Sequence, residues 1–292
     1  VAVGKGQLGT VRLRQRRFPE ALAAFRGARE RFAALGEAVS VAGAWHQIGR
    51  VHQDAGNGAA AEDAYRQSLA INVQCNDVAG QARTLNQLGT LYATVLDRPE
   101  DAVTHHRQAA ERYLALHDAA GEGRTRSKLA STLRRLGRRS EARREIERAL
   151  ACKRGLGHAV EPWKTWDILA AIENDDGRAP EARQAIRQAR EAFLAYRRDG
   201  GENHSSGGPL AAEITHLLLT GDSASADALL AQLAGELASD ADAPAWAPPF
   251  VAALRAIVAG ERSAALADAP GLTYDHAAEI VLLLERLTAA GR

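Results

Sequence analysis

The sequence repeats a short pattern about every 40 residues, and this period restricts the possible folds more than any other feature. Each copy has a large aliphatic residue followed by glycine or alanine. The five copies are Leu8-Gly9, Ile48-Gly49, Leu88-Gly89, Leu129-Ala130 and Leu169-Ala170. Small and large residues that recur at a fixed phase are the signature of stacked structural repeats. The sequence therefore predicts an array of similar units rather than one globular core.

Two further positions keep the same phase. An alanine follows each small residue by 12 positions, or by 13 in the third copy: Ala21, Ala61, Ala102, Ala142 and Ala182. Four residues later stand Phe25, Tyr65, His106, Ile146 and Ile186. A spacing of four places both positions on one face of a helix. Each unit is therefore predicted to hold two helices, with one extra residue in the third turn and with His106 packed in the interior.

Loop-forming residues set the predicted boundaries. Five repeats are expected at about 3–40, 41–79, 80–120, 121–159 and 161–198. In the fourth repeat, Ser140 is the residue type that caps a helix. Residues 199–208 are rich in glycine and form a connector, with an anion-binding nest as the alternative reading. Beyond it, 209–292 contains four more helical stretches, with a loop over 241–250, and is interpreted as degenerate helical repeats that cap the array.

The order Trp45, Ile48-Gly49, Ala61 and Tyr65 resembles the tetratricopeptide repeat family. The 40-residue period is similar to that of the longer repeats in kinesin light chains and bacterial regulators. The resemblance covers about residues 1–200, although Ala130 and Ala170 replace the usual glycine. It implies an all-α, right-handed superhelical solenoid, here with an atypical helical C-terminal cap. It also implies a concave groove, lined by the first helix of each repeat, that binds another protein or peptide.

Charge is distributed unevenly along the chain. Residues 1–160 hold 26 Lys and Arg against 16 Asp and Glu, a net charge of +10, whereas 161–292 hold 11 against 20, a net charge of −9. Such asymmetry bears on binding partners rather than on the fold. It favours an acidic ligand on the first half or a basic one on the second. Solvated helix faces without a ligand are the alternative.

The repeat phases of the resembled family select the residues expected in the groove. They are His46, Arg50, Arg83, Asn86, Arg124, Ser127, Arg134 and Lys164. Cations dominate this set, so the expected ligand is an acidic peptide, a C-terminal carboxylate or a phosphorylated segment. The ligand can belong to another protein or to another domain of the same full-length protein. The alternative is nucleic acid, chiefly RNA, bound by the basic first half, although few aromatic side chains are present for base stacking.

Motifs for catalysis are absent from the sequence. It has no phosphate-binding loop, no His-Glu-x-x-His motif and no Gly-x-Ser-x-Gly motif. Cys75 and Cys152 are far apart and lack metal-ligand spacing. We therefore expect no catalytic residue, metal or cofactor; an enzymatic site within 199–292 is the alternative. No stretch of about 18 apolar residues exists, so no membrane segment is expected, and the cysteine usage suits the cytoplasm.

Two segments connect the chain to signalling. Residues 161–166 and 195–203 are similar to tetratricopeptide segments of bacterial signalling proteins. The chain also begins with Val1 and contains no methionine. We therefore expect a fragment or processed product that serves as the non-enzymatic scaffold or ligand-sensing module of a larger bacterial signalling protein.

Overall fold

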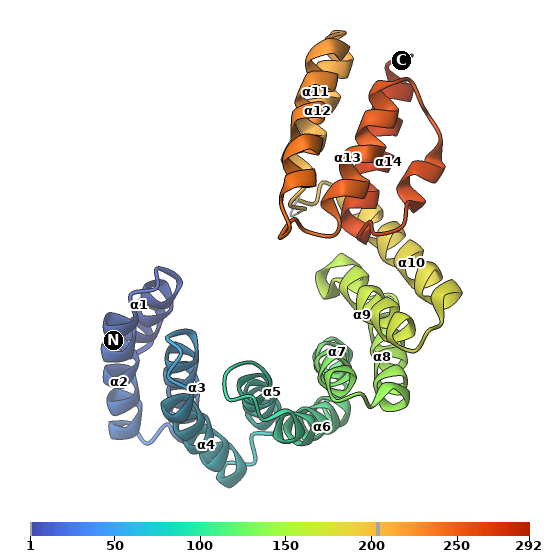
Figure 1. The fold of residues 1–292 in the computed structure, drawn as a ribbon. Coiled ribbons are helices and arrows are strands. Elements are labelled where there is room, and N and C mark those ends of the chain that lie inside the picture. Colours follow the sequence, from blue (N-terminus) through green and yellow to red (C-terminus); the bar gives the residue numbers. More distant parts are fainter. Residues whose placement is uncertain (1, 203–204) are drawn as a thin grey trace. The chain divides into compact units, whose positions relative to one another are not determined.

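A computed structural model describes residues 2–202 and 205–292, and within them the chain is α-helical, with no strand (Figure 1). The chain divides into two compact units, residues 1–160 and 161–292. This all-α repeat architecture confirms the predicted fold class. The division falls at the point where the net charge changes sign, and not at the glycine-rich connector. The helix pair expected as the fifth repeat therefore belongs to the second unit.

The first unit contains four helix–turn–helix pairs. Their helices are α1 (Ala2–Arg14), α2 (Phe18–Ala34), α3 (Ala38–Asp54), α4 (Gly58–Gln74), α5 (Val78–Thr94), α6 (Pro99–Ala115), α7 (Ala119–Arg135) and α8 (Arg139–Lys153). The short 3-10 helix η1 (His158–Val160) follows. Residues 15–17, 55–57 and 136–138 form three-residue turns within the pairs, whereas the third turn, 95–98, has four residues. The predicted extra residue in that turn is thus confirmed.

The helices of this unit end in a common way. A residue with left-handed backbone recurs about every 20 positions, at Arg16, Gly36, Gly56, Asn76, Asp97, His117 and Gly137. At Gly36, for example, the following amide of Glu37 donates to the carbonyl of Phe32 at 3.0 Å. This bond satisfies a carbonyl that the helix end leaves unpaired and reverses the chain. Helix ends of this type therefore occur twice in each 40-residue repeat.

Aspartate caps two helix starts of the first unit, and the predicted serine caps none. Asp77 and Asp118 precede α5 and α7, and their carboxylates accept hydrogen bonds from the amides of Gly80 and Gly121 at 2.9 and 2.8 Å. The expected cap at Ser140 is wrong, because α8 begins one residue earlier and the serine lies inside its first turn.

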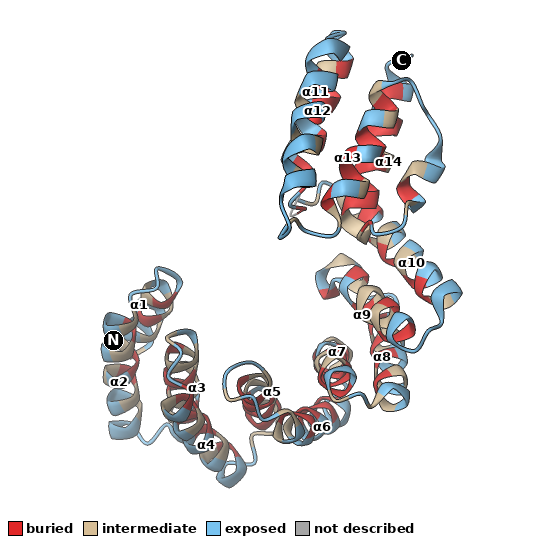
Figure 2. Cartoon of the chain, in the orientation of Figure 1, coloured by how far each residue is buried: buried red, intermediate tan, exposed pale blue. Residues whose placement is uncertain are grey.

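The paired helices approach closely at the repeated small residue. A Cβ atom on Gly49 would lie 2.6 Å from the ring of Tyr65, and one on Gly89 would lie 2.6 Å from Nδ1 of His106. Gly9 meets Phe25 in the same way. In the fourth pair the small residue is Ala130 and the facing position is Ile146, and both are fully buried. A flat ring thus faces glycine, and a branched aliphatic side chain accompanies alanine. Figure 2 shows the buried residues concentrated inside the helix pairs.

The second unit combines one further helix pair with a four-helix core. Its helices are α9 (Pro162–Asp175), α10 (Ala179–Arg198), α11 (Gly208–Thr220), α12 (Ser223–Ser239), α13 (Ala247–Val258) and α14 (Tyr274–Ala289), with the 3-10 helix η2 (Ala264–Asp268) before α14. Residues from α11 to α14 share one hydrophobic core around Phe250, Leu254 and Ile280. The loop predicted over 241–250 ends earlier, because Pro248 and Pro249 lie in the first turn of α13, where proline is tolerated.

Part of the predicted connector is packed rather than open. Ser205, Gly207 and Gly208 are buried, and Oγ of Ser206 lies 3.2 Å from Nε2 of His276 on α14. The ring of Trp246 stacks on that histidine at a centroid distance of 3.8 Å. Residues 203 and 204 of the connector lie outside the described residues, and the anion-binding nest stays a prediction.

We predict that Gly89→Ala destabilises the protein, because the new methyl group collides with the His106 ring. The expected loss in unfolding free energy is about 1–3 kcal/mol. The double variant Gly89→Ala/His106→Ile, which copies the fourth pair, should recover most of this loss. Gly43→Ala on α3, where nothing lies within 4 Å of the new atom, is the control. It should stabilise the helix by about 0.5–1 kcal/mol. Urea unfolding checks this, and equal stabilisation by Gly43→Ala and Gly89→Ala would contradict it.

The helix ends give a second prediction. His117 adopts a φ of 55°, which is costly for a residue with a side chain. We expect His117→Gly to raise the unfolding free energy by about 1 kcal/mol. The matched change Gly137→Ala, at an equivalent helix end with a φ of 71°, should lower it by a similar amount. Thermal unfolding that moves in the same direction for both variants would contradict this account.

Candidate binding groove

The predicted groove positions of the first unit lie on α3, α5 and α7, the first helices of the second to fourth pairs. Arg83, Arg124 and Arg134 are exposed, and His46, Arg50 and Asn86 are half-buried. Ser127 is buried, and its hydroxyl donates to the carbonyl of Gly123 at 2.9 Å. Lys164 is exposed on α9 in the second unit, where it pairs with Glu161. The groove proposal therefore rests on the first unit and on its arginines.

Arg83 and Arg124 form no hydrogen bond or ion pair with any residue that the structure describes. Among the described residues Arg50 has no acidic partner, and its guanidinium donates to the amide oxygen of Gln47 at 3.2 Å. Guanidinium groups without an acidic partner are available to bind an external carboxylate or phosphate. Three successive first helices thus each present an uncompensated positive charge.

Many other arginines of the same unit are already neutralised. Arg126 contacts Glu122 at 2.7 Å and Glu145 at 2.6 Å, and all three side chains are nearly buried. Arg138 pairs with Glu100 at 2.9 Å and Glu141 at 2.7 Å. Further pairs are Arg66 with Glu62, Arg98 with Asp101, Arg107 with Glu141, Arg135 with Asp97 and Arg148 with Glu145. The basic character of the fourth repeat is therefore much weaker than its composition suggests.

Acidic residues are scarce on the three first helices. α5 contains none, α3 contains only Asp54 at its last position, and α7 contains only Glu122. Since Glu122 is held by Arg126, no described acid on α5 or α7 is placed to neutralise Arg83 or Arg124. The charge of these helices is consequently positive and local.

Neighbouring titratable groups respond to this charge. Burial, reinforced by Arg50 and Arg83, lowers the pKa of His46 to about 4. Burial and the charge of Arg124 also lower the pKa of Lys128. Both shifts disfavour further positive charge, as expected where cations gather and water is partly excluded. His46 is therefore neutral at physiological pH.

Polar side chains connect successive first helices. Nδ1 of His46 on α3 lies 3.3 Å from Oγ1 of Thr84 on α5. Nζ of Lys128 on α7 donates to Oγ1 of Thr90 on α5 at 3.0 Å. Asn86 has a longer contact, with Oγ1 of Thr125 at 3.5 Å. His46 and Asn86 thus contribute to the contacts between successive first helices.

Thr84 and Lys128 make two of these contacts and were not predicted from the sequence. Lys128 follows Arg124 by four residues, and this helical spacing is the signal that could have placed both on one face.

A small cavity that includes several polar side chains opens beside Arg83. It has a volume of about 210 Å³ and lies among α3, α4 and α5. Its polar lining includes His46, Ser68, Asn72 and Thr84, of which Ser68 and Thr84 lie 3.2 Å apart through their hydroxyl oxygens. The cavity can accept one polar group, so the wall offers donors and acceptors in addition to charge.

The described residues contain neither a candidate metal site nor a candidate membrane span. The described residues contain no group of three or more His, Cys, Asp or Glu side chains that could hold a metal ion. None of the described helices has both the length and the hydrophobicity that a membrane span requires.

The family is shown by a sequence match over half of the chain. The model of the tetratricopeptide repeat family matches residues 1–72 and 80–155. The chain belongs to the tetratricopeptide repeat family. No curated protein matches the sequence.

Solved structures share this fold. BtubC (BKLC) from P. vanneervenii is 20% identical, with a TM-score of 0.61 over 65% of this chain and 78% of that protein. A putative kinesin light chain from Podosopora anserina with nearly identical repeats is 17% identical, with a TM-score of 0.57 over 67% of this chain and 96% of that one. A signal transduction ATPase with numerous domains and a tetratricopeptide repeat sensor, from Pyrococcus horikoshii, is 15% identical. Its TM-score is 0.62 over 99% of this chain, which spans 43% of that protein.

These likenesses confirm the predicted long, kinesin-light-chain-like repeats. Tetratricopeptide repeat proteins are in general protein-interaction scaffolds without enzymatic activity, and they bind other proteins or peptides. The fold of this chain is that of such a scaffold.

The buried histidines predict a loss of stability in acid. Burial, with smaller effects from Lys128 and His105, lowers the pKa of His106 to about 3. The unfolded chain takes up this proton below about pH 6.5, whereas the folded chain does not. The stability is thus complete above pH 6.5 and falls as the pH decreases.

Lowering the pH from about 7.5 to about 5 should reduce the unfolding free energy of the original chain by about 2 kcal/mol more than that of the His106→Ile variant. His216→Gln, an exposed substitution on α11, is the control and should keep the original pH dependence. Urea unfolding at the two pH values measures the difference. Identical pH dependence of His106→Ile and the original chain would contradict the assignment.

Proposed function

We propose that the first unit binds an acidic segment of another protein along α3, α5 and α7. The observation that carries this proposal is the row formed by Arg50, Arg83 and Arg124. These arginines have no acidic partner among the described residues and lie on three successive first helices that contain few acids, whereas Arg126 and Arg138 of the same unit are paired. A ligand that supplies carboxylates removes this unbalanced charge. A terminal carboxylate or a phosphorylated side chain offers the same chemistry.

The wall supports binding of an extended chain. Arg83 lies beside the small cavity, where a backbone or side-chain amide of a ligand can find the hydroxyl groups of Ser68 and Thr84. Arg124 lies on the next first helix, near Lys128, whose pKa it helps to lower. Charged contacts would give the complex its orientation and rapid association, and polar contacts its register.

We also propose a cellular role for this module. We infer that it acts without catalysis, in the cytoplasm, as the scaffold or sensor of a larger bacterial signalling protein, whose other domains are candidate sources of the acidic segment. The similarity of 161–166 and 195–203 to segments of signalling proteins supports this inference. The structural likeness to the sensor-bearing ATPase from Pyrococcus horikoshii concerns the fold alone.

Nucleic acid is the less favoured ligand. Among Trp, Tyr and Phe, α3, α5 and α7 contain only Trp45, whose ring lies under Arg29, and Tyr92, which is buried, so few rings are available for base stacking. Paired arginines also reduce the charge that remains for a phosphate backbone. Binding that ignores sequence and disappears by about 0.2 M salt would mean general phosphate attraction only.

We predict that Arg83→Glu/Arg124→Glu weakens binding of acidic peptides at least about tenfold, because two attractive contacts become repulsive. The control is Arg31→Glu/Arg144→Glu. It makes the same change in net charge at two exposed arginines of α2 and α8. The probe is a set of peptides selected from a random displayed library with the full chain. Circular dichroism confirms that both variants keep their helices, and fluorescence anisotropy gives the affinities.

The results of these measurements distinguish acidic-peptide binding from its alternatives. Enrichment of Asp- and Glu-rich peptides that lose affinity only with the α5/α7 variant supports the proposal. Equal loss with both variants would show that net charge alone attracts the peptides. Selection of neutral or basic peptides, or retention of only nucleic acid, would overturn the proposal.

A further inference from the structure

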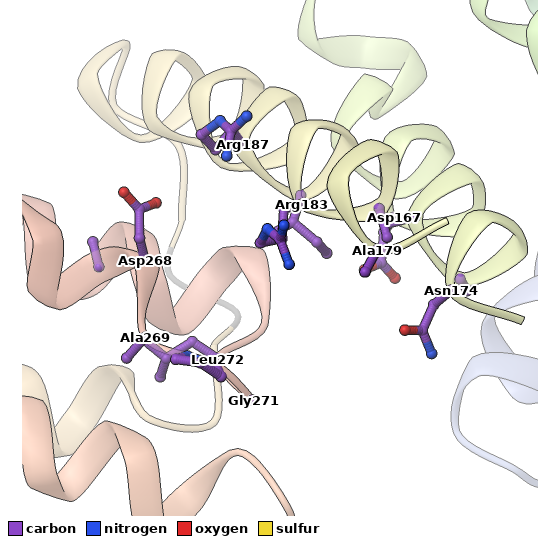
Figure 3. Close-up of a pocket in the computed structure, with 15 residues that line it drawn as sticks. Asp167, Asn174, Ala179, Arg183, Arg187, Asp268, Ala269, Gly271 and Leu272 are labelled. Atoms are coloured by element: carbon purple, nitrogen blue, oxygen red, sulfur yellow. The ribbon is translucent and has the colours of Figure 1, made fainter. Parts of the chain in front are cut away.

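The second unit contains a cavity of about 420 Å³ that the acidic-segment proposal does not use (Figure 3). Three parts of the unit form its walls: α9, α10 and the segment 267–272, which includes the end of η2. The volume is within the range of sites for small molecules, about 300–1,000 Å³. It is too small for a folded partner.

The cavity has room for a ligand because small alanine side chains line much of it. The lining includes Ala170, Ala171, Ala179, Ala182, Ala267 and Ala269. Ile186, Pro270 and Leu272 supply larger apolar contacts. Most of the wall is therefore apolar, which favours a ligand with a hydrocarbon body.

The third wall is fixed in place by a well-shielded arginine. Nη1 of Arg190 on α10 donates to the carbonyl oxygen of Ala267 at 2.9 Å and to Oδ1 of Asp268 at 2.8 Å. The Arg190 side chain is 14% exposed. Gly271 permits the turn that follows, with a φ of 90°, and Leu272 belongs to the core of the four-helix group. Hydrogen bonds from Arg190 and the packing of Leu272 thus fix this wall of the cavity.

Two arginines give the cavity its charge. Arg183 and Arg187 stand one turn apart on α10, and both line the cavity. Figure 3 shows Arg183 between Leu272 on one side and Asp167 and Asn174 on the other. Neither arginine has a hydrogen-bond or ion-pair partner among the described residues. Asp268 is neutralised by Arg190, and Asp167, on the α9 wall, interacts with another residue.

We propose that this cavity binds a small amphipathic carboxylate, with its charged group between Arg183 and Arg187 and its hydrocarbon body against the alanines. Two guanidinium groups one helical turn apart can share one carboxylate. The apolar wall adds affinity that a simple inorganic anion cannot gain. The site lies wholly within the second unit and is independent of the peptide groove of the first.

The test measures binding of octanoate and 3-phenylpropanoate to the full chain by saturation-transfer NMR and calorimetry. A dissociation constant on the order of 1 mM or tighter is expected for at least one of them. Octanamide and octylamine, which keep the hydrocarbon chain but lack the negative charge, should bind at least about tenfold more weakly.

Variants locate the site. Arg183→Gln/Arg187→Gln should weaken carboxylate binding at least about tenfold, and Ala171→Leu should weaken it by filling the cavity. Arg139→Gln/Arg144→Gln removes the same number of charges from exposed positions of α8 and should leave carboxylate binding unchanged. Acidic-peptide affinity should be unaffected by Arg183→Gln/Arg187→Gln, so failure of one proposal is distinguishable from failure of the other.

The inference is overturned if neither carboxylate binds, if octanamide binds as well as octanoate, or if both cavity variants keep the original affinity.

Discussion

The close approach of two helices at one small residue is the contact on which the repeat architecture depends. In the first three pairs the ring of the second helix lies against a glycine of the first, at a distance that a methyl group would not allow. In the fourth pair Ala130 and Ile146 replace the glycine and the ring. Each contact buries one face of both helices, while Arg83 on α5 and Arg124 on α7 stay exposed.

Features set within one repeat could be predicted from the sequence, since the period reports local packing. The helix pairs, the extra residue before Arg98 and the packed His106 follow from spacing alone. The Ser140 cap and the loop up to Phe250 were wrong because helix starts depend on backbone geometry that residue type does not determine. The ion pairs that the arginines form could not be predicted from the sequence either. Arg138 meets Glu100 across 38 residues of sequence, and only the folded stack brings them together.

Charge and architecture divide the chain at the same place. The basic residues 1–160 form one compact unit and the acidic residues 161–292 the other. Within the first unit, ion pairs hold several arginines of the second helices and turns, whereas Arg50, Arg83 and Arg124 on the first helices have no acidic partner among the described residues. Within the second unit, Arg183 and Arg187 keep a local positive charge despite acidic surroundings. Net charge alone therefore indicates neither of the two proposed binding surfaces; both proposals rest on the positions of arginines that have no acidic partner among the described residues.

Hydrogen exchange on the full chain, with and without a selected acidic peptide, tests the central claim most directly. If the peptide lies along the first helices, the amides of α3, α5 and α7 should exchange more slowly when it is bound, and those of α4, α6 and α8 should change less. Slower exchange confined to the second helices, or to residues 161–292, would contradict the assignment of the groove.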